Sequence, residues 1–465
     1  MKDNFFNDIK GSIRFSHAKT LWGYIDTCNT WGNKCNSTSN AVNIMPNIVL
    51  TTKCNQRCAY CFASAYTCST SREMSDAVFD DVLHFLRINR ETTVRLVGGE
   101  PTLHPRFSKF VDRSIRKGFR VSILSNGLWP RKVHTHLRQI DPTQISYLIN
   151  VNHPTSYSKG TWKSICDTLS FLSTYTDTAL SINLDKTNSD FEYIIETAKR
   201  FDIRSIRFSI VRPSLDAPQI YDPPSDFIEI IASLQKQCAD AGILCGSDCT
   251  FITPCRIENA PGGKRIANAL LFDATFDPIG SCSPSMDIFP DFHAIYCFGI
   301  GKALSVDLNT HKYLSEIESI FFYAKNMMLK EDPTCSACSY YRIRRCLGGC
   351  WSERMLDHDY SDALERFNRL AKKTDLHRYP YKLTDGIKIR KLRNNGHVAV
   401  TAPPTYRHVY STTDMQLMQM VLKNGSPEKR IEYYCKYGEV TPRTAIRRLN
   451  DFILQCITAG TIDFI

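Results

Sequence analysis

The sequence predicts an α/β protein made of an open, partial (β/α)6 barrel, a cysteine-rich region and a small α+β, winged-helix-like unit at the C-terminus. Three observations predict this order. Short apolar runs alternate with segments of helical period from Pro46 to about Val211, cysteines crowd the next stretch, and regular structure returns after about residue 397. The predicted regions are an N-terminal extension (1–45), the barrel (46–215), the cysteine-rich region (216–375) and the C-terminal unit (376–465).

Six strands are predicted in the barrel region, each bounded by turn residues or by the start of a helical pattern. Their ranges are 47–52, 94–99, 119–125, 145–151, 179–185 and 203–211. Ser75 precedes an amphipathic pattern and is a predicted N-cap, and Gly118 should end a helix that begins near Phe107. Six strand-helix units are too few for a closed eight-stranded barrel, so we expect an open one.

The stretch from Cys249 to Cys350 follows a predicted helix at 226–242 and is expected to be rich in loops, with few long elements. Such a segment cannot bury much apolar surface and would need cross-linking by metal. Beyond it, short strands are predicted at 397–402 and 406–410, then three helices and a terminal strand at 461–465. Two helix starts are marked by a hydroxyl residue before proline: Ser426 before Pro427 and Thr441 before Pro442.

The composition predicts a soluble, cytoplasmic protein with no export signal and no membrane association. Of the 465 residues, 43% are hydrophobic and 23% charged, with no uncharged apolar run of membrane-spanning length. The 19 cysteines then favour metal ligation over disulfides, because reducing compartments keep thiols free. Residues 376–465 hold 14 Lys+Arg and 7 Asp+Glu, or +7 of the net +11, which suits an acidic peptide or nucleic acid; a solvated surface is the commoner explanation.

Three cysteines follow the first predicted strand at the spacing Cys54-x3-Cys58-x2-Cys61. Three thiolates on a short loop can hold a 4Fe-4S cluster and leave one iron without a protein ligand. A zinc site completed by a fourth ligand from elsewhere is the alternative. With Tyr60 before the third cysteine, the run resembles the radical S-adenosylmethionine (SAM) superfamily.

A second run strengthens this resemblance: Gly98-Gly99-Glu100-Pro101 ends the second predicted strand. Alone, it would indicate a turn. In that family the run contacts the methionyl amino group, so the resemblance implies that Gly98, Gly99 and Glu100 bind SAM. It also implies cofactor contacts for Tyr60 and for polar residues at later strand ends, although an asparagine there often only closes a turn. These residues are Ser125, Asn126, Asn150, Asn152 and Asn183.

The resemblance implies an oxidoreductase chemistry in which an electron from the reduced cluster breaks a sulfur-carbon bond of SAM and yields a 5'-deoxyadenosyl radical. An electron donor such as flavodoxin or ferredoxin would be needed. The sequence identifies no catalytic acid or base. Asp287 and Asp291 could line a cavity, but loop aspartates usually cap turns, and His153 is more often a satisfied edge residue.

Eight further cysteines form a second set, the number needed for two protein-ligated 4Fe-4S clusters, with two zinc sites as the alternative. They are Cys249, Cys255, Cys282, Cys297, Cys335, Cys338, Cys346 and Cys350. The stretch resembles the SPASM extension of radical SAM enzymes that modify peptides, which implies two auxiliary clusters. It departs from that pattern in the seven-residue spacer after Cys338, in Phe292 where a glycine usually stands, and in the lack of a cysteine between Cys350 and Cys435.

The remaining cysteines carry no predicted function. Cys166, Cys238, Cys435 and Cys456 lie in helix-like patterns and are taken as ordinary thiols, and Cys28, Cys35, Cys68 and Cys245 are unassigned.

The C-terminal unit resembles the precursor recognition element of enzymes that modify ribosomally synthesised peptides, which implies that a leader peptide adds to it as a strand. Its apolar positions, such as Met418 and Ile453, also suit an ordinary three-helix core. A winged helix that binds nucleic acid is the rival interpretation, because Arg443, Arg447 and Arg448 could meet phosphates.

Three functions follow from these patterns. The first is a maturase that forms a cross-link, thioether or epimerised centre in a precursor peptide. The second keeps the radical chemistry but uses a small molecule, nucleotide or RNA. The third is a metal-stabilised regulator that binds nucleic acid without catalysis.

Overall fold

The computed structural model describes residues 46–67, 72–175, 177–185, 190–215, 227–249, 253–258, 282, 285–342, 346, 348–373, 375–384, 387–391, 397–400, 407–423, 425–438, 440–458 and 461–464. The chain divides into two compact units. Unit 1 comprises Met1–Gly301 and Arg345–Asp357, and unit 2 comprises Lys302–Arg344 and His358–Ile465.

A mainly parallel sheet forms the centre of unit 1. Strands β1 to β7 pair in parallel in sequence order, β8 pairs in parallel with the free side of β1, and β9 runs antiparallel to β8. The strands are β1 (Asn47–Thr51), β2 (Thr93–Gly98), β3 (Arg120–Ser125), β4 (Ile145–Asn150), β5 (Thr178–Leu184), β6 (Ser205–Ile210), β7 (Leu244–Ser247), β8 (Asp287–Ile288) and β9 (His293–Ile295). All six predicted strands are confirmed to within two residues at either end.

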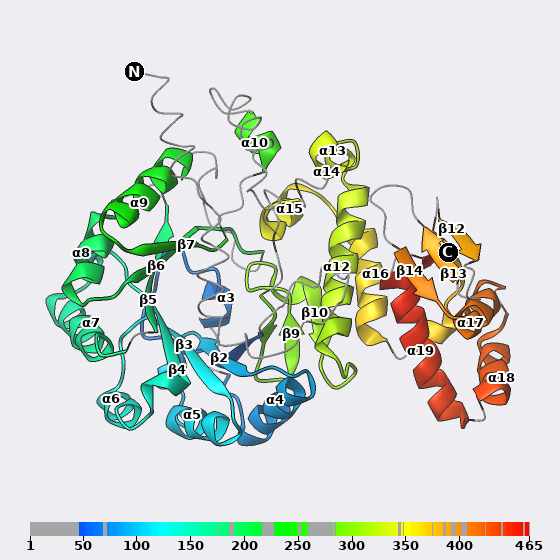
Figure 1. Ribbon diagram of the computed structural model, residues 1–465, viewed down its shortest axis with the longest axis horizontal. Helices are drawn as coiled ribbons and strands as arrows, with labels where there is room; N and C mark the ends of the chain where they lie inside the picture. Colours follow the sequence, from blue (N-terminus) through cyan, green and yellow to red (C-terminus); the bar gives the residue numbers. More distant parts are fainter. Residues whose placement is uncertain are drawn as a thin grey trace. The chain divides into compact units, whose positions relative to one another are not determined.

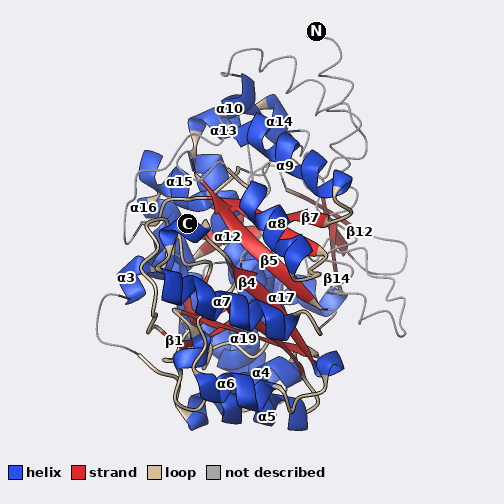
Figure 2. Cartoon of the chain, turned by 90° about the vertical axis from the view of Figure 1, so that its left-hand side faces the viewer, coloured by secondary structure: helices blue, strands red, loops and turns tan. Residues whose placement is uncertain are grey.

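Helices cover the outer side of these strands, as Figure 1 shows for α4 to α9 and Figure 2 shows from the side. They are α4 (Asp76–Ile88), α5 (Phe107–Arg116), α6 (Arg131–Leu137), α7 (Lys159–Leu172), α8 (Glu192–Arg200) and α9 (Ile228–Asp240). Ser75 accepts a hydrogen bond from the Val78 amide at 3.2 Å, and Gly118 has φ +83°, so both predicted helix ends are confirmed. The short helical turns of unit 1 are α3 (Ser64–Thr67), η3 (Pro101–Leu103), η4 (Pro142–Gln144), η5 (Pro154–Ser156), α10 (Pro254–Glu258) and α15 (Trp351–Asp357).

Strand β7 was not predicted. Its four residues read LCGS, so they show neither an apolar run nor an alternating pattern, and the neighbouring strand β6 supplies the pairing that extends the chain there. The parallel sheet therefore continues with β7 beside β6, and β8 adds a further parallel strand on the other side of β1.

The described residues between Cys249 and Cys350 include one long element that was not individually predicted, α12 (Leu314–Glu331) of unit 2, a helix of 18 residues. The other described elements of this stretch are short, as expected. The buried positions of α12, including Ile317, Phe321 and Met328, recur at helical spacing, and Phe321 stacks on Phe367 of α16 (Ser361–Lys372) with ring centroids 6.0 Å apart. The other elements of this part are β10 (Ser305–Asp307), α13 (Pro333–Ser336), α14 (Ser339–Arg342) and η9 (Leu376–Arg378), with η8 (Gly301–Leu304) at the boundary of the two units.

The end of the chain forms a three-stranded antiparallel sheet in the order β12-β13-β14, followed by three helices. The elements are β12 (Lys388–Lys391), β13 (His397–Val400), β14 (Arg407–Tyr410), α17 (Thr412–Leu422), α18 (Pro427–Gly438), α19 (Pro442–Thr458), β11 (Tyr381–Leu383) and β15 (Ile462–Phe464). The terminal strand β15 pairs with β11 and not with the three-stranded sheet. The winged-helix assignment stays a prediction. In the described part of the chain, no helix has the length and apolarity to span a membrane.

Candidate active site

The loop of Cys54, Cys58 and Cys61 leaves the carboxyl end of β1, and all three cysteines are half-buried. Two tight turns shape it: the Cys61 amide donates to the Cys58 carbonyl at 3.1 Å, and the Ser64 amide donates to the Cys61 carbonyl at 3.1 Å. The Gln56 amide also points at the Cys54 sulfur, 3.5 Å away. The three thiols thus lie on one short, turned segment, as a shared cluster requires.

Gly98 and Gly99 lie directly against the start of this loop. The Gly99 amide donates to the Thr51 carbonyl at 2.8 Å, and the Glu100 amide donates to the Lys53 carbonyl at 2.8 Å. A Cβ on Gly98 would lie 2.3 Å from the Thr51 oxygen, and one on Gly99 would lie 2.4 Å from the Lys53 oxygen. Glycine is needed at both positions because the backbone of the cysteine loop fills the space of a side chain.

Glu100 is fully buried and joins the ends of β2 and β3. Its carboxylate accepts hydrogen bonds from the Thr102 hydroxyl at 2.6 Å, from the Ser125 hydroxyl at 2.9 Å and from the Asn126 amide at 2.8 Å. Burial raises the pKa of the Glu100 carboxyl, while these donors oppose the rise. The sequence singled out Glu100, Ser125 and Asn126 separately, and the structure brings all three together.

The side chain of Asn126 connects this carboxylate to the cysteine loop. Its Oδ1 accepts from the Leu128 amide at 2.9 Å, while its Nδ2 lies 2.8 Å from Asn55 Oδ1 and 3.8 Å from the Cys54 sulfur. Asn55 in turn donates from its own Nδ2 to the Leu128 carbonyl at 2.9 Å. The side-chain amide of Asn126 is therefore fixed at both its oxygen, by Leu128, and its nitrogen, by Asn55.

A row of hydrogen-bonded side chains, here called the polar ladder, crosses the ends of β4, β5 and β6. The Tyr60 hydroxyl donates to Asn152 Oδ1 and accepts from Asn150 Nδ2 at 2.8 Å. Asn183 Nδ2 donates to Asn150 Oδ1 at 2.9 Å, and the Ser209 hydroxyl donates to Asn183 Oδ1. Burial is the main cause that raises the pKa of Tyr60, so its hydroxyl keeps its proton.

The polar ladder ends at the second cysteine, because Asn152 Nδ2 lies 3.7 Å from the Cys58 sulfur. The ladder members Tyr60, Asn150, Asn152 and Asn183 were all named from the sequence. Ser209 was not, since a serine within a strand carries no distinguishing signal.

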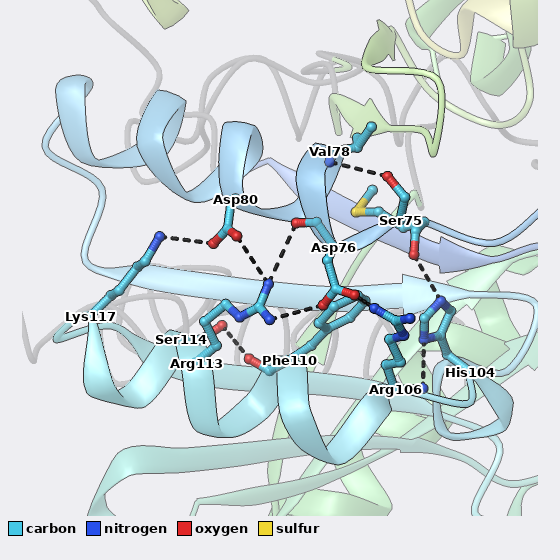
Figure 3. Close-up of polar contacts among 11 residues, drawn as sticks. Ser75, Asp76, Val78, Asp80, His104, Arg106, Phe110, Arg113, Ser114 and Lys117 are labelled. Atoms are coloured by element: carbon cyan, nitrogen blue, oxygen red, sulfur yellow. Dashed lines mark hydrogen bonds and ion pairs between the residues drawn. The ribbon is translucent and has the colours of Figure 1, made fainter.

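His104 is a further residue that the sequence did not indicate. It is buried, its Nδ1 accepts from the Arg106 amide at 3.1 Å, and its Nε2 therefore carries the proton donated to the Met74 carbonyl at 3.1 Å (Figure 3). Desolvation lowers the pKa of the His104 imidazole. The turn that carries Glu100 is thus fastened to the chain segment beside β1.

Ion pairs between α4 and α5 support the same turn from outside (Figure 3). Asp76 pairs with Arg106 and with Arg113 at 2.9 Å, and Asp80 pairs with Arg113 at 3.1 Å and with Lys117 at 3.0 Å. Because these charges are partly exposed, we assign the network a role in orienting the helices and little net stability.

Four cysteines of the second set influence one another electrostatically. Although part of Cys249 is exposed, desolvation first, and then the charges of Cys282, Cys350 and Cys297, raise the pKa of its thiol to about 12. Burial, Cys282 and Cys350 likewise raise the pKa of Cys297 well above its usual value. The Tyr296 hydroxyl donates to the Cys282 carbonyl at 3.2 Å and lies 3.7 Å from its sulfur.

The other cysteines of the second set lie in different surroundings. The Cys255 thiol donates to the Thr253 hydroxyl at 3.2 Å, and the Gly348 amide donates to the Cys346 sulfur at 3.5 Å. Cys335 and Cys338 belong to unit 2 and lie at the two ends of one turn, in which the Cys338 amide donates to the Cys335 carbonyl at 3.0 Å. The Cys335 amide donates to the Asp332 side chain at 3.0 Å. Among the described residues, no three Cys, His, Asp or Glu side chains form a ligand group for a single metal ion.

A buried ion pair accompanies the group of Cys249, Cys282, Cys297 and Cys350. Arg212 Nη1 pairs with the Glu353 carboxylate, with side chains 7% and 5% exposed, and Arg212 Nε donates to the Cys249 carbonyl at 2.9 Å. The Ser352 and Cys350 side chains are 3.1 Å apart. Sequence patterns gave no sign of this pair, since its members are 141 residues apart.

Phe292 occupies the position where the pattern usually has glycine, and its φ is +61°. It closes the β8–β9 hairpin, with the Phe292 amide donating to the Phe289 carbonyl at 3.0 Å and the Phe289 amide donating to the His293 carbonyl at 2.8 Å. The residue type differs, but the backbone has the left-handed conformation that glycine adopts most readily.

The aspartates and the histidine that the sequence offered as possible acids or bases all make local structural contacts. Asp287 is a buried residue of β8, not a turn cap, and it accepts from Asn47 Nδ2 at 2.7 Å and from the Ser285 hydroxyl at 2.9 Å. Asp291 is exposed and lies 3.8 Å from Arg72, and His153 caps η5.

Of the unassigned cysteines, Cys28, Cys35 and Cys68 lie outside the described residues. Cys245 lies in β7, where a hydrogen bond with Cys238 and burial raise the pKa of its thiol.

Unit 2 contains a separate pocket of about 520 Å³ between α12, α16 and the β11–β15 pair. It is lined by Met327, Lys330, Arg366, Lys382, Thr384, Asp463 and Phe464. Asp463 pairs with Arg366 at 3.2 Å and accepts from the Tyr323 hydroxyl at 3.0 Å. Cations therefore outnumber carboxylates along the lining.

Comparison with known proteins places residues 48–175 in the family described as the Radical SAM superfamily, which confirms the radical SAM domain predicted from the motifs. An S-adenosylmethionine-dependent nucleotide dehydratase of Thermoplasmatales archaeon (strain ISO4-H5) is 38% identical over 81 residues, 17% of this chain and 28% of that protein. The antilisterial bacteriocin subtilosin biosynthesis protein AlbA of Bacillus subtilis (strain 168) is 23% identical over 230 residues, 42% of this chain and 49% of that protein. This chain thus spans less than half of either relative.

Among solved structures, the crystal structure of Streptococcus suis SuiB bound to S-adenosylmethionine aligns with a TM-score of 0.48 and 11% identity. The alignment covers 68% of this chain and 74% of that chain.

Proposed function

We propose that this chain is a radical SAM enzyme that reductively cleaves SAM to a 5'-deoxyadenosyl radical and modifies a ribosomally synthesised precursor peptide. The observation that carries the proposal is the loop of Cys54, Cys58 and Cys61, which packs against the turn of Gly98 to Glu100 inside the segment that matches the radical SAM family. A cross-link, a thioether or an epimerised centre would each be compatible with this chemistry.

The residues at the carboxyl edge of the sheet suit a 4Fe-4S cluster and SAM. Three cysteines on one loop leave an iron open to SAM, and the bound cluster would supply the electron that cleaves it. The protein's own contribution is orientation. Glu100 fixes the ends of β2 and β3 beside the loop, and Asn126 and the polar ladder present amide groups along the same edge.

Two auxiliary 4Fe-4S clusters are part of the proposal. The mutual influence of Cys249, Cys282, Cys297 and Cys350 supports these four as the ligands of one cluster. The ligands of the other auxiliary cluster stay a prediction from the sequence.

A peptide substrate is favoured by the similarity to AlbA, a protein of bacteriocin subtilosin biosynthesis. The C-terminal sheet and helices would bind the leader peptide, and the pocket lined by Lys330, Arg366 and Lys382 would suit an acidic segment of it. A flavodoxin or ferredoxin would donate the electron.

A nucleotide substrate is the second candidate, because two nucleotide dehydratases share 38% and 30% identity with short stretches of the chain. A metal-stabilised regulator that binds nucleic acid without catalysis is the third. Formation of 5'-deoxyadenosine would eliminate this third function.

One experiment separates the candidates. The full chain is reconstituted anaerobically to about twelve irons, three clusters of four. It is then incubated with SAM, a reductant, and either a short peptide encoded beside its gene or nucleoside triphosphates. We expect 5'-deoxyadenosine and a modified peptide. A cross-link or thioether would change the peptide's mass, and an epimerised centre would appear as a D-amino acid in chiral analysis after hydrolysis. Turnover of a nucleotide with no change in the peptide would overturn the peptide proposal.

A further inference from the structure

The three cysteines of the loop have different neighbours. Cys54 faces the Asn126 amide at 3.8 Å, and Cys58 faces the Asn152 amide at 3.7 Å. Cys61 instead packs against a buried apolar cluster. The cluster consists of Val49, Ala63, Val97, Phe289, Ile295 and Phe298. Cys54 and Cys58 therefore each have a side-chain amide donor beside the sulfur.

The hydrogen-bond partners fix which end of each amide faces the sulfur. Asn126 Oδ1 accepts from the Leu128 backbone amide, a group that can only donate, so the NH2 group must be the end directed at Cys54. Asn126 Nδ2 also donates to Asn55 Oδ1 at 2.8 Å, which leaves its second hydrogen for the sulfur.

Asn152 is oriented by the same logic through the polar ladder. Its Oδ1 accepts from the Tyr60 hydroxyl, whose oxygen already accepts from Asn150 Nδ2. Its backbone amide donates to the Tyr157 hydroxyl at 2.8 Å, which holds the main chain. The NH2 group of Asn152 is thereby directed at Cys58.

Hydrogen bonds to cluster sulfurs are among the factors that set the reduction potential of an iron-sulfur cluster. Uptake of one electron adds negative charge to the cluster and its thiolates, so an N–H donor stabilises the reduced form more than the oxidised form. We propose that Asn126 and Asn152 raise the reduction potential of the cluster held by the cysteine loop, and so ease its one-electron reduction by a low-potential protein donor.

This inference rests on one part of the proposed function, the cluster held by Cys54, Cys58 and Cys61. It does not depend on the substrate. Its test is an EPR-monitored redox titration of the reconstituted full chain. The signal that changes on addition of SAM identifies the cluster with the open iron, which separates it from any auxiliary cluster.

Asn126→Leu and Asn152→Leu remove the donors at nearly constant volume. Each should shift the midpoint to lower potential, so that several-fold less of this cluster is reduced at the wild-type midpoint, a tenfold change in the ratio being about 59 mV for one electron. Asn89→Leu is the matched control. Asn89 Nδ2 donates to the Phe85 carbonyl at the end of α4, and its loss should leave the midpoint unchanged.

Tyr60→Phe keeps the ring, frees the Asn152 amide to rotate and should produce a smaller shift of the same sign. If a leucine variant fails to assemble its cluster, Asn126→Ala and Asn152→Ala replace it, because each removes the donor without adding a charge beside the cluster. Midpoints equal to wild type in the loaded variants would overturn the inference. A wild-type chain with no SAM-responsive signal would instead overturn the proposed function.

Discussion

The two cysteine groups of unit 1 differ in how their members are brought together. Cys54, Cys58 and Cys61 lie within eight consecutive residues, and the turns of one loop are enough to gather them. Cys249, Cys282, Cys297 and Cys350 span about a hundred residues, so they influence one another's pKa only when the chain has folded. Contacts close in sequence cost little loop entropy, whereas distant ones depend on the packing around them.

The supporting residues differ in the same way. The loop is backed by glycines and by neutral amides at the strand ends, whereas the four-cysteine group is backed by the buried ion pair of Arg212 and Glu353. A substitution of a loop cysteine should therefore alter chemistry with little effect on folding. A substitution beside the four-cysteine group should alter stability first.

The largest expected effect separates the two groups by function. Cys58→Ala should abolish 5'-deoxyadenosine formation, because the cluster that holds SAM loses a ligand. Cys297→Ala should lower iron by about four atoms per chain but still cleave SAM, since the loop is intact. Product is measured by chromatography and iron by colorimetry. Equal loss of SAM cleavage in both variants would contradict the separation.

The second largest expected effect is the loss of stability when the buried ion pair of Arg212 and Glu353 is broken. Glu353→Gln leaves the Arg212 charge buried without its partner and should cost about 3–5 kcal/mol in the free energy of unfolding. The double variant Arg212→Met/Glu353→Leu should recover most of this loss, because no charge stays unpaired. Denaturant titration measures both. The control is Glu365→Gln, which breaks the more exposed pair with Arg369 and should cost less than about 0.5 kcal/mol.

The order of strands could be predicted because each of the six is a short apolar run between turns, as in RVSILS of β3. Strand β7 could not, since LCGS gains its strand conformation from pairing with β6. Helix α12 was missed although its apolar spacing was readable, because the surrounding cysteines suggested loops.

The cysteine loop and Glu100 were predictable because each belongs to a motif of a few consecutive residues, Cys54 to Cys61 and Gly98 to Pro101. Asn126 and Asn152 were named as cofactor contacts, but their proximity to sulfur depends on how the ends of β3 and β4 align with the loop. No single-sequence pattern carries that register. The same limit hid His104, whose partner Met74 is 30 residues away.

A third test uses the glycines that support each group. Gly99→Ala should destabilise the chain by about 3 kcal/mol and displace the loop, because its Cβ would lie 2.4 Å from the Lys53 carbonyl, which cannot move alone. Gly349→Ala adds strain at φ +72° and meets a Thr253 methyl at 2.5 Å, so we expect about 2 kcal/mol. Denaturant titration gives the stabilities. Iron in the SAM-responsive cluster should fall only for Gly99→Ala.

The smallest expected effect is a pH dependence beside the four-cysteine group. Burial raises the pKa of Asp287 to about 6 from its usual 3.8, so the folded state binds more protons than the unfolded state between these values. The stability that this group contributes is complete below about pH 4 and is lost as pH rises through 6. Between pH 5 and 8 the loss should be about 1.4 kcal/mol.

Asp287→Asn should remove this slope, so that the variant gains stability relative to wild type as pH rises, measured by denaturant titration at both pH values. Asp291→Asn, on an exposed carboxylate of the same hairpin, controls for the change in charge. A difference between Asp287→Asn and wild type that stays constant from pH 5 to 8 would show that the buried carboxylate is compensated by Asn47 and Ser285. Asp287 would then be ionised beside the four-cysteine group, whereas the groups beside the cysteine loop, Asn126 and Asn152, are neutral amides.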